Sequence, residues 1–291
     1  MSKANLQPIV LIGAARSGTK ILRDTLAMSL GAPAVPYDVG YVWRYGNESC
    51  PHDCLNPEDI KPRTRRLVRG FITGYADSQG CVVEKTVGNT LRVPFVADLL
   101  PEAVFVHVIR DGMDVAESAR REWEARHDLR YLAAKLRHFP LRLVPSYGRK
   151  FIVNATLARW RTTPNEAGGP SSTWGPRYPG MDRDLANDGL LAVVARQWRL
   201  SVEAAVRDLS RVHQQVVTTR YEDLVTNPGG VLCRVVTEFG VPLNKSRLEA
   251  ASAMISRGSI GKGRQRLEDS EHALLSREMG ATLRELGYDT S

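Results

Sequence analysis

The sequence predicts an α/β fold of three layers, in which helices cover both faces of a mostly parallel central sheet. Apolar runs of strand length alternate with longer stretches of helical periodicity, which is the pattern of consecutive β–α units. The first apolar run ends in a glycine-containing turn that leads into a helix, as in a P-loop-like phosphate-binding unit. The 291 residues are 43% hydrophobic and 25% charged, which is typical of a globular domain.

The predicted strands are short and rich in apolar residues, and they lie at residues 8–13, 81–84, 104–109 and 215–219. An apolar run without alternation is typical of a strand buried on both faces of a parallel sheet. The predicted helices lie between or after these strands, at about 18–30, from 112 onward, at 190–209 and at 273–286. Together these elements give the expected β–α alternation.

Residues 162–184 interrupt the pattern, because they are rich in Pro, Gly, Ser and Thr. Long loops in compact domains often carry function, and the aromatic residues and prolines here favour an ordered segment. We therefore expect one domain spanning residues 1–291, with a lid at 162–184. No apolar run approaches the roughly 20 residues of a membrane helix, and the N-terminus lacks the features of a signal peptide. These features predict a cytoplasmic protein.

Four cysteines are present, and two of them, Cys50 and Cys54, are close in sequence. A structural zinc site needs four ligands, usually in paired clusters, and the sequence has no second cluster. Reduced thiols and no metal are expected. The net charge of +8 indicates an anionic partner. No nucleic-acid-binding motif accompanies that charge, so a phosphorylated ligand is the preferred explanation and no nucleic-acid partner is expected.

The loop Gly13-Ala-Ala-Arg-Ser-Gly-Thr-Lys20 has the Gly-x4-Gly spacing of a Walker A motif. That motif continues with Lys and then Ser or Thr, whereas here Thr19 precedes Lys20. The hydroxyl that would bind Mg²⁺ is thus displaced, which disfavours hydrolysis of ATP or GTP. A P-loop nucleotide-dependent kinase remains an alternative, with metal-dependent ATP binding as its mark. A non-catalytic nucleotide- or nucleic-acid-binding protein is a second alternative, which predicts that binding of DNA or RNA depends steeply on salt concentration.

Five segments resemble, in the same order, motifs of the sulfotransferases that use 3′-phosphoadenosine-5′-phosphosulfate (PAPS). Arg16 to Thr19 resembles their 5′-phosphosulfate loop, although Ala15 and Lys20 depart from it. Arg110, with Ser118 eight residues later, resembles their 3′-phosphate motif. The remaining resemblances are to the lysine-bearing strand, the Tyr-Glu-Asp segment and the C-terminal loop, at 83–86, 219–224 and 256–262.

This resemblance implies transfer of a sulfuryl group from PAPS to a hydroxyl or amine by in-line displacement, without a metal. It implies that Arg16 and Lys85 lie at the oxygens around the sulfur. The residues that it assigns to the nucleotide are Arg16, Ser17, Gly18, Thr19, Lys20, Arg110, Ser118, Tyr221, Arg257 and Gly258. The acceptor stays open among a small molecule, a carbohydrate and a peptide, and so does the oligomeric state.

The general base is the least constrained residue. Cytosolic small-molecule sulfotransferases have a His two residues after the lysine, but Val87 occupies that position here. The tyrosylprotein and carbohydrate types use a carboxylate, which in the former follows the first helix, and the matching residue is Asp38. Glu84 is the alternative, although side chains alternate along a strand, which places Glu84 opposite Lys85. His107 lies within an apolar strand and is expected in the core.

Overall fold

The computed structural model describes residues 7–124, 174–256 and 260–290, and all structural statements below refer to them. The chain divides into two compact units, residues 1–120 with 175–291, and residues 121–174. Almost all of the second unit lies outside the described residues, as do residues 162–173 of the predicted lid. The fold below is therefore that of the first unit.

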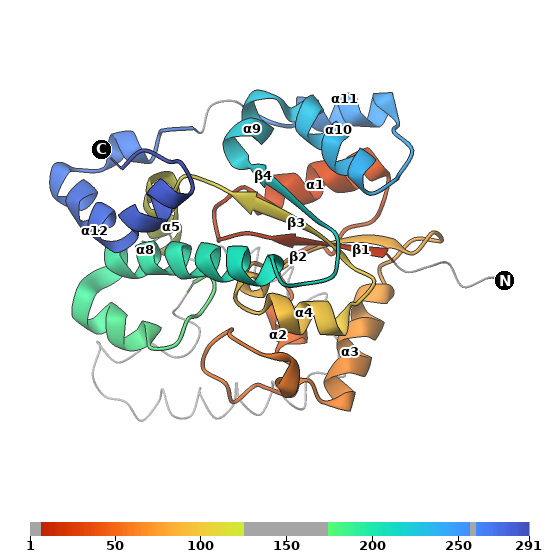
Figure 1. Cartoon of the computed structure of the whole chain (residues 1–291), viewed down its shortest axis with the longest axis horizontal. Coiled ribbons are helices and arrows are strands. Elements are labelled where there is room, and N and C mark those ends of the chain that lie inside the picture. The colour runs from red at the N-terminus through yellow and green to blue at the C-terminus, as the bar shows by residue number, and fades with distance from the viewer. Residues whose placement is uncertain (1–6, 125–173, 257–259, 291) are drawn as a thin grey trace. The chain divides into compact units, whose positions relative to one another are not determined.

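A four-stranded parallel sheet forms the centre of this unit, with strand order β2-β1-β3-β4 (Figure 1). The strands are β1 (Gln7–Ile12), β2 (Cys81–Lys85), β3 (Val104–Ile109) and β4 (Val216–Arg220). Their bounds agree with the predicted strands to within one residue. The prediction of a parallel sheet is confirmed, because all three strand pairings are parallel, and β1 and β3 are buried along almost their whole length.

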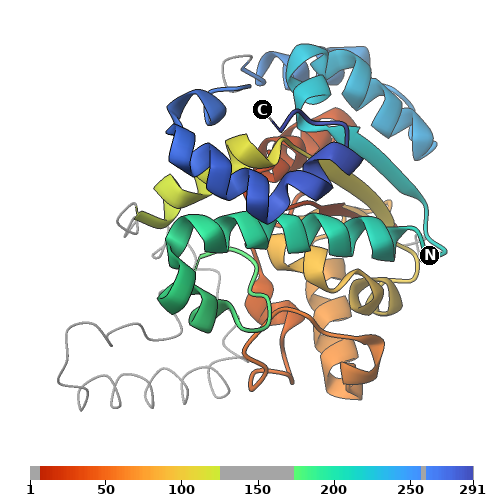
Figure 2. The same cartoon turned by 60° about the vertical axis from the view of Figure 1, so that its left-hand side comes forward.

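The helices lie on both faces of the sheet, as Figures 1 and 2 show. They are α1 (Thr19–Leu30), α2 (Gly40–Trp43), α3 (Pro62–Thr73), α4 (Val93–Leu99), α5 (Gly112–Glu124), α8 (Met181–Leu209), α9 (Tyr221–Thr226), α10 (Pro228–Glu238), α11 (Lys245–Ala253) and α12 (Asp269–Glu285). Short 3₁₀ turns are η1 (Pro57–Asp59), η2 (Val87–Leu91) and η5 (Arg264–Arg266). The three-layer prediction is confirmed.

The core on one face of the sheet joins β1 and β3 to α1, α9, α10 and α11. Ile9 and Leu11 of β1 pack there against Leu22 and Leu26 of α1, and all four side chains are almost fully buried. This follows from strand alternation, which sends every second residue of β1 to the same face. Burial of aliphatic side chains of this size stabilises the fold by about 1.5–3 kcal/mol each.

The helix predicted at 190–209 is longer in the structure, because α8 begins at Met181. It contains a kink at Gly189, whose φ of 80° and ψ of 171° are not helical, so the predicted start at 190 matches the second half. The predicted loop 162–184 was therefore too long at its C-terminal end. Gly180 begins the helix with a positive φ, and the acidic residues Asp182 and Asp184 in the first turn complement the helix dipole.

Candidate functional site

The carboxyl ends of the four parallel strands lie at one edge of the sheet, where ligands of open α/β folds bind. Each strand ends next to a segment singled out by the sequence. The loop 13–18 follows β1, Lys85 is the last residue of β2, Arg110 follows β3, and Tyr221 follows β4. The fold thus brings together segments that are far apart in the chain.

The loop after β1 has the shape that a phosphate site requires. Gly18 has a φ of +81°, and a Cβ built on it would lie 2.2 Å from the Tyr221 ring, so only glycine fits. The loop runs into the N-terminus of α1, whose first amides have no acceptor within the helix. Ser17 is fully buried, and its hydroxyl has no hydrogen-bond partner among the described residues. A buried hydroxyl donor beside free helix amides fits a phosphate oxygen.

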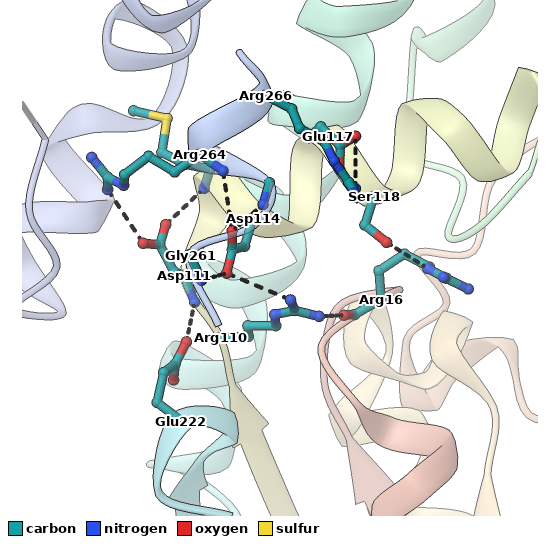
Figure 3. Close-up of polar contacts among 12 residues, drawn as sticks. Arg16, Arg110, Asp111, Asp114, Glu117, Ser118, Glu222, Gly261, Arg264 and Arg266 are labelled. Atoms are coloured by element: carbon teal, nitrogen blue, oxygen red, sulfur yellow. Dashed lines mark hydrogen bonds and ion pairs between the residues drawn. The ribbon is translucent and has the colours of Figure 1, made fainter. Parts of the chain in front are cut away.

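Arg16 joins this loop to the predicted 3′-phosphate motif (Figure 3). Its Nε donates a hydrogen bond to the Ser118 hydroxyl at 3.0 Å, and its backbone carbonyl accepts one from Nη1 of Arg110 at 3.0 Å. Arg16 adopts a φ of 67°, unusual for a residue with a side chain and a sign of local constraint. The Arg110 guanidinium lies 4.3 Å from the centroid of the Tyr221 ring. The two predicted phosphate-binding segments are therefore in direct contact.

Asp114 holds the C-terminal loop against the start of α5, as Figure 3 shows. Its carboxylate accepts backbone hydrogen bonds from Gly261, Gly263 and Arg264 at 2.8, 2.7 and 3.1 Å, and lies 3.5 Å from Nη2 of Arg110. Asp114 was not singled out from the sequence, because the amides that it binds lie 147–150 residues away in the chain. The predicted nucleotide-binding residues Arg257 and Gly258 lie outside the described part of the chain.

Lys85 and Asp38 form an ion pair with a distance of 2.6 Å between Nζ and Oδ1. The residues before Asp38 run beside the edge of the sheet, where Ala34 forms a parallel bridge with Val83 of β2. Arg23 of α1 fixes the same segment by donating hydrogen bonds to the carbonyl oxygens of Val35 and Pro36. Asp38 is thereby brought to the end of β2, and its side chain keeps 29% exposure.

Glu84 is fully buried and contacts a different set of partners. Trp43 Nε1, the Thr86 hydroxyl and Asn89 Nδ2 lie within hydrogen-bond distance of its carboxylate, at 3.1, 2.6 and 3.1 Å. Burial raises the pKa of Glu84 to about 7, although the hydrogen bonds from Thr86 and Trp43 oppose that rise. Asn89 continues the network to the buried Arg92, whose Nε donates to its Oδ1.

The Lys20 side chain does not point into the predicted phosphate loop. It is 77% exposed, and its ammonium pairs with Asp24 of α1 at 3.1 Å, so Lys20 can contribute only its backbone amide to the loop. His107 is buried in β3, as expected, and burial lowers its pKa to about 4, which keeps the ring neutral at physiological pH.

The thiols of Cys50 and Cys54 are free, and burial raises the pKa of Cys54 to about 11. Within the described ranges, no group of three or more His, Cys, Asp and Glu side chains is placed to hold a metal ion. In the same ranges, no helix has the length and apolar character needed to cross a membrane.

The sequence matches no protein-family model and no curated protein. Solved structures do match. A sulfotransferase from Mycobacterium avium is 11% identical with a TM-score of 0.55, covering 98% of this chain and 78% of that one. The sulfotransferase domain of the Synechococcus PCC 7002 olefin synthase is 16% identical with a TM-score of 0.52, covering 99% and 98%. A mouse sulfotransferase complexed with PAP is 10% identical with a TM-score of 0.50, covering 98% and 92%.

Proposed function

Because the chain has the fold of these sulfotransferases, we propose that it transfers a sulfuryl group from PAPS to a hydroxyl or amine of an acceptor. The observation that carries the proposal is the position of Arg16, which belongs to the phosphate loop and contacts both Arg110 and Ser118. A donor with phosphates at its 3′ and 5′ positions needs two anion sites that lie close together. The presence of PAP in the mouse structure of the same fold supports this donor.

The two anion sites differ in their donors. At the loop, the 5′-phosphate would be held by the amides that begin α1 and by the Ser17 hydroxyl, which has no hydrogen-bond partner in the part of the chain that the structure describes. At the second site, Arg110 would supply a guanidinium fork and Ser118 a hydroxyl donor to the 3′-phosphate. Tyr221, packed against Gly18 and Arg110, would define the wall on which the adenine lies.

When bound, PAPS supplies the sulfuryl group and a phosphate leaving group. Asp38 would accept the proton of the acceptor as the acceptor oxygen or nitrogen bonds to sulfur. The bond from sulfur to the phosphate oxygen breaks, and its electron pair stays on the phosphate. Lys85 would orient the Asp38 carboxylate and, with Arg16, place positive charge beside the oxygens where negative charge develops. The acceptor class stays open among small molecules, carbohydrates and peptides.

Fewer observations support the two alternatives, a nucleotide-dependent kinase and a nucleic-acid-binding protein. A kinase would need a lysine followed by a metal-binding hydroxyl in the loop, and Thr19 and Lys20 stand in the opposite order. In addition, the Lys20 ammonium points to Asp24. A nucleic-acid-binding protein would rest on the net charge of +8 alone.

Calorimetric titration with PAP in EDTA tests the donor. Saturable binding at one site per chain is expected, and it should persist without divalent cations. A screen of hydroxyl and amine acceptors with PAPS, read by mass spectrometry, then identifies the acceptor class. Binding of ATP with Mg²⁺ in place of PAP would favour the kinase.

A further inference from the structure

Glu84, Lys85 and Thr86 are consecutive residues at the carboxyl end of β2. Lys85 binds the carboxylate of Asp38, whereas the Thr86 hydroxyl accepts a hydrogen bond from the backbone N–H of Val39 at 3.0 Å. Both Thr86 and Val39 are buried. The end of β2 therefore holds the segment of Asp38 and Val39 at two points, the Asp38 carboxylate and the Val39 amide.

The Thr86 hydroxyl is also 2.6 Å from Oε1 of Glu84. A hydroxyl has one proton to donate, and Val39 already donates to this oxygen, so the Thr86 proton is free to point at Glu84. A distance of 2.6 Å is typical of a hydroxyl that donates to a carboxylate. Glu84 thus sets the orientation in which the hydroxyl receives the Val39 amide.

Glu84 holds the same segment from a second side through α2. Val39 caps this helix, and its carbonyl accepts hydrogen bonds from the N–H groups of Val42 and Trp43. Trp43, the last residue of α2, donates its ring N–H to Glu84. The start of α2 is therefore linked to Glu84 through Thr86, and its end is linked directly. Within the described residues, the Glu84 carboxylate is fully buried under its three hydrogen-bond partners and does not face solvent.

We propose that Thr86 and Glu84 are positioning residues for Asp38. They fix the peptide between Asp38 and Val39 against β2, so that the carboxylate meets Lys85. This inference rests on the proposed function, in which Asp38 is the base. Neither Thr86 nor Glu84 touches the reacting atoms, and both act through the backbone that carries Asp38.

The first test measures hydrogen exchange of the Val39 amide in Thr86→Val, which keeps the shape of the side chain and removes the hydroxyl. Thr90→Val is the matched control, because the buried Thr90 hydroxyl donates to the Ser201 carbonyl at 3.1 Å. Exchange at Val39 should be at least about tenfold faster in Thr86→Val, because the amide loses its acceptor, and unchanged in Thr90→Val. Equal exchange in the two variants would overturn the inference. Should Thr86→Val fail to fold, Thr86→Ala serves the same comparison.

The second test measures PAP release from PAPS and the affinity for PAP. Thr86→Val should lower kcat by about 10–100-fold, because small displacements of a catalytic group cost rates of that order. Its dissociation constant for PAP should stay within about twofold of the wild-type value, since the phosphate sites are untouched. Thr86→Ser keeps the hydroxyl and should restore most of kcat. An unchanged kcat in Thr86→Val overturns the inference.

The outcomes separate this inference from the function on which it rests. A wild-type protein that produces no PAP from PAPS with any acceptor refutes the proposed function. The link between Thr86 and Val39 is then still decided by amide exchange, which needs no substrate. A wild-type protein that turns over, with Thr86→Val indistinguishable from Thr90→Val, refutes the positioning role alone.

Discussion

Lys85 and Asp38 are separated by 47 residues in the chain, and their side chains meet at 2.6 Å. The contact depends on the stretch before Asp38, which runs parallel to β2 and is joined to it at Ala34 and Val83. A cation and a carboxylate that meet at the carboxyl edge of a parallel sheet have the chemistry to orient an acceptor and to take its proton.

Asp38→Asn removes the proposed base and keeps the size of the side chain. We expect kcat to fall by about 10²–10⁴-fold, the usual cost of losing a positioned base, while PAP binding is preserved. Asp98→Asn, which alters an exposed ion pair with Arg65, is the control and should keep kcat. Steady-state kinetics and calorimetry provide the measurements. Near-normal kcat in Asp38→Asn would remove Asp38 from the mechanism.

Arg110→Ala tests the 3′-phosphate site. Charge-assisted hydrogen bonds contribute about 1.5–3 kcal/mol, so affinity for PAP should fall by about 10–150-fold. Adenosine-5′-phosphosulfate lacks the 3′-phosphate and should bind the wild type and the variant alike. Ser118→Ala leaves the bond between Arg110 and Arg16 in place and should show a smaller loss. If calorimetry gives unchanged PAP affinity in Arg110→Ala, the site is misassigned.

Gly18→Ala separates backbone strain from a steric clash. Gly18 and Gly240 both have positive φ, 81° and 67°, and alanine at such a position costs about 1–2 kcal/mol. A Cβ at Gly18 meets the Tyr221 ring at 2.2 Å, whereas nothing lies within 4 Å of one at Gly240. Gly18→Ala should therefore lower the Tm more than Gly240→Ala and weaken PAP binding, which Gly240→Ala should not. Equal effects of the two substitutions on both properties contradict the packed phosphate loop.

Glu84 makes stability depend on pH. Because its pKa is raised from 4.5 to about 7, the folded state binds a proton more tightly than the unfolded state. The contribution of Glu84 to the free energy of unfolding is fully present below about pH 4.5 and is lost as the pH rises through about 7. Between pH 5 and 8, the free energy of unfolding measured in urea should decline less steeply with rising pH in Glu84→Gln than in the wild type.

His107 titrates in the opposite sense, since its pKa is lowered to about 4, and its contribution cancels when the variant and the wild type are compared. Glu58→Gln, on an exposed 3₁₀ turn, is the control and should follow the wild type. A slope in Glu84→Gln that equals the wild-type slope would mean that Glu84 is ionised throughout this range.

The strands could be predicted closely because the apolar runs are short and rich in Val, Ile and Thr, which favours buried strands over buried helix segments. Arg110 and Lys85 were singled out by their resemblance to sulfotransferase motifs, and the structure places both at the carboxyl ends of parallel strands, which share one edge of the sheet. Asp114 could not be placed in this way. Its role comes from hydrogen bonds to residues 147–150 positions away, and only the folded chain brings those amides to its carboxylate.

The contacts of Glu84 could be predicted only in part from the sequence. Strand alternation predicted that it would differ from Lys85 in its surroundings, and its partners do differ. The sequence could not show that Thr86 connects Glu84 to the backbone of Val39, because that contact joins β2 to a segment 47 residues earlier. The start of α8 at Met181, within the predicted loop, could have been predicted from the sequence, since Gly180 is followed by acidic residues that suit the first turn of a helix.

The most direct test of sulfuryl transfer uses PAPS with radiolabelled sulfur, EDTA and the acceptor found by mass spectrometry. We expect the wild-type protein to move the label to the acceptor and to form one PAP for each label transferred. Asp38→Asn should bind PAP and transfer almost no label. Transfer of phosphate from ATP with Mg²⁺, with no label moved from PAPS, would contradict the account.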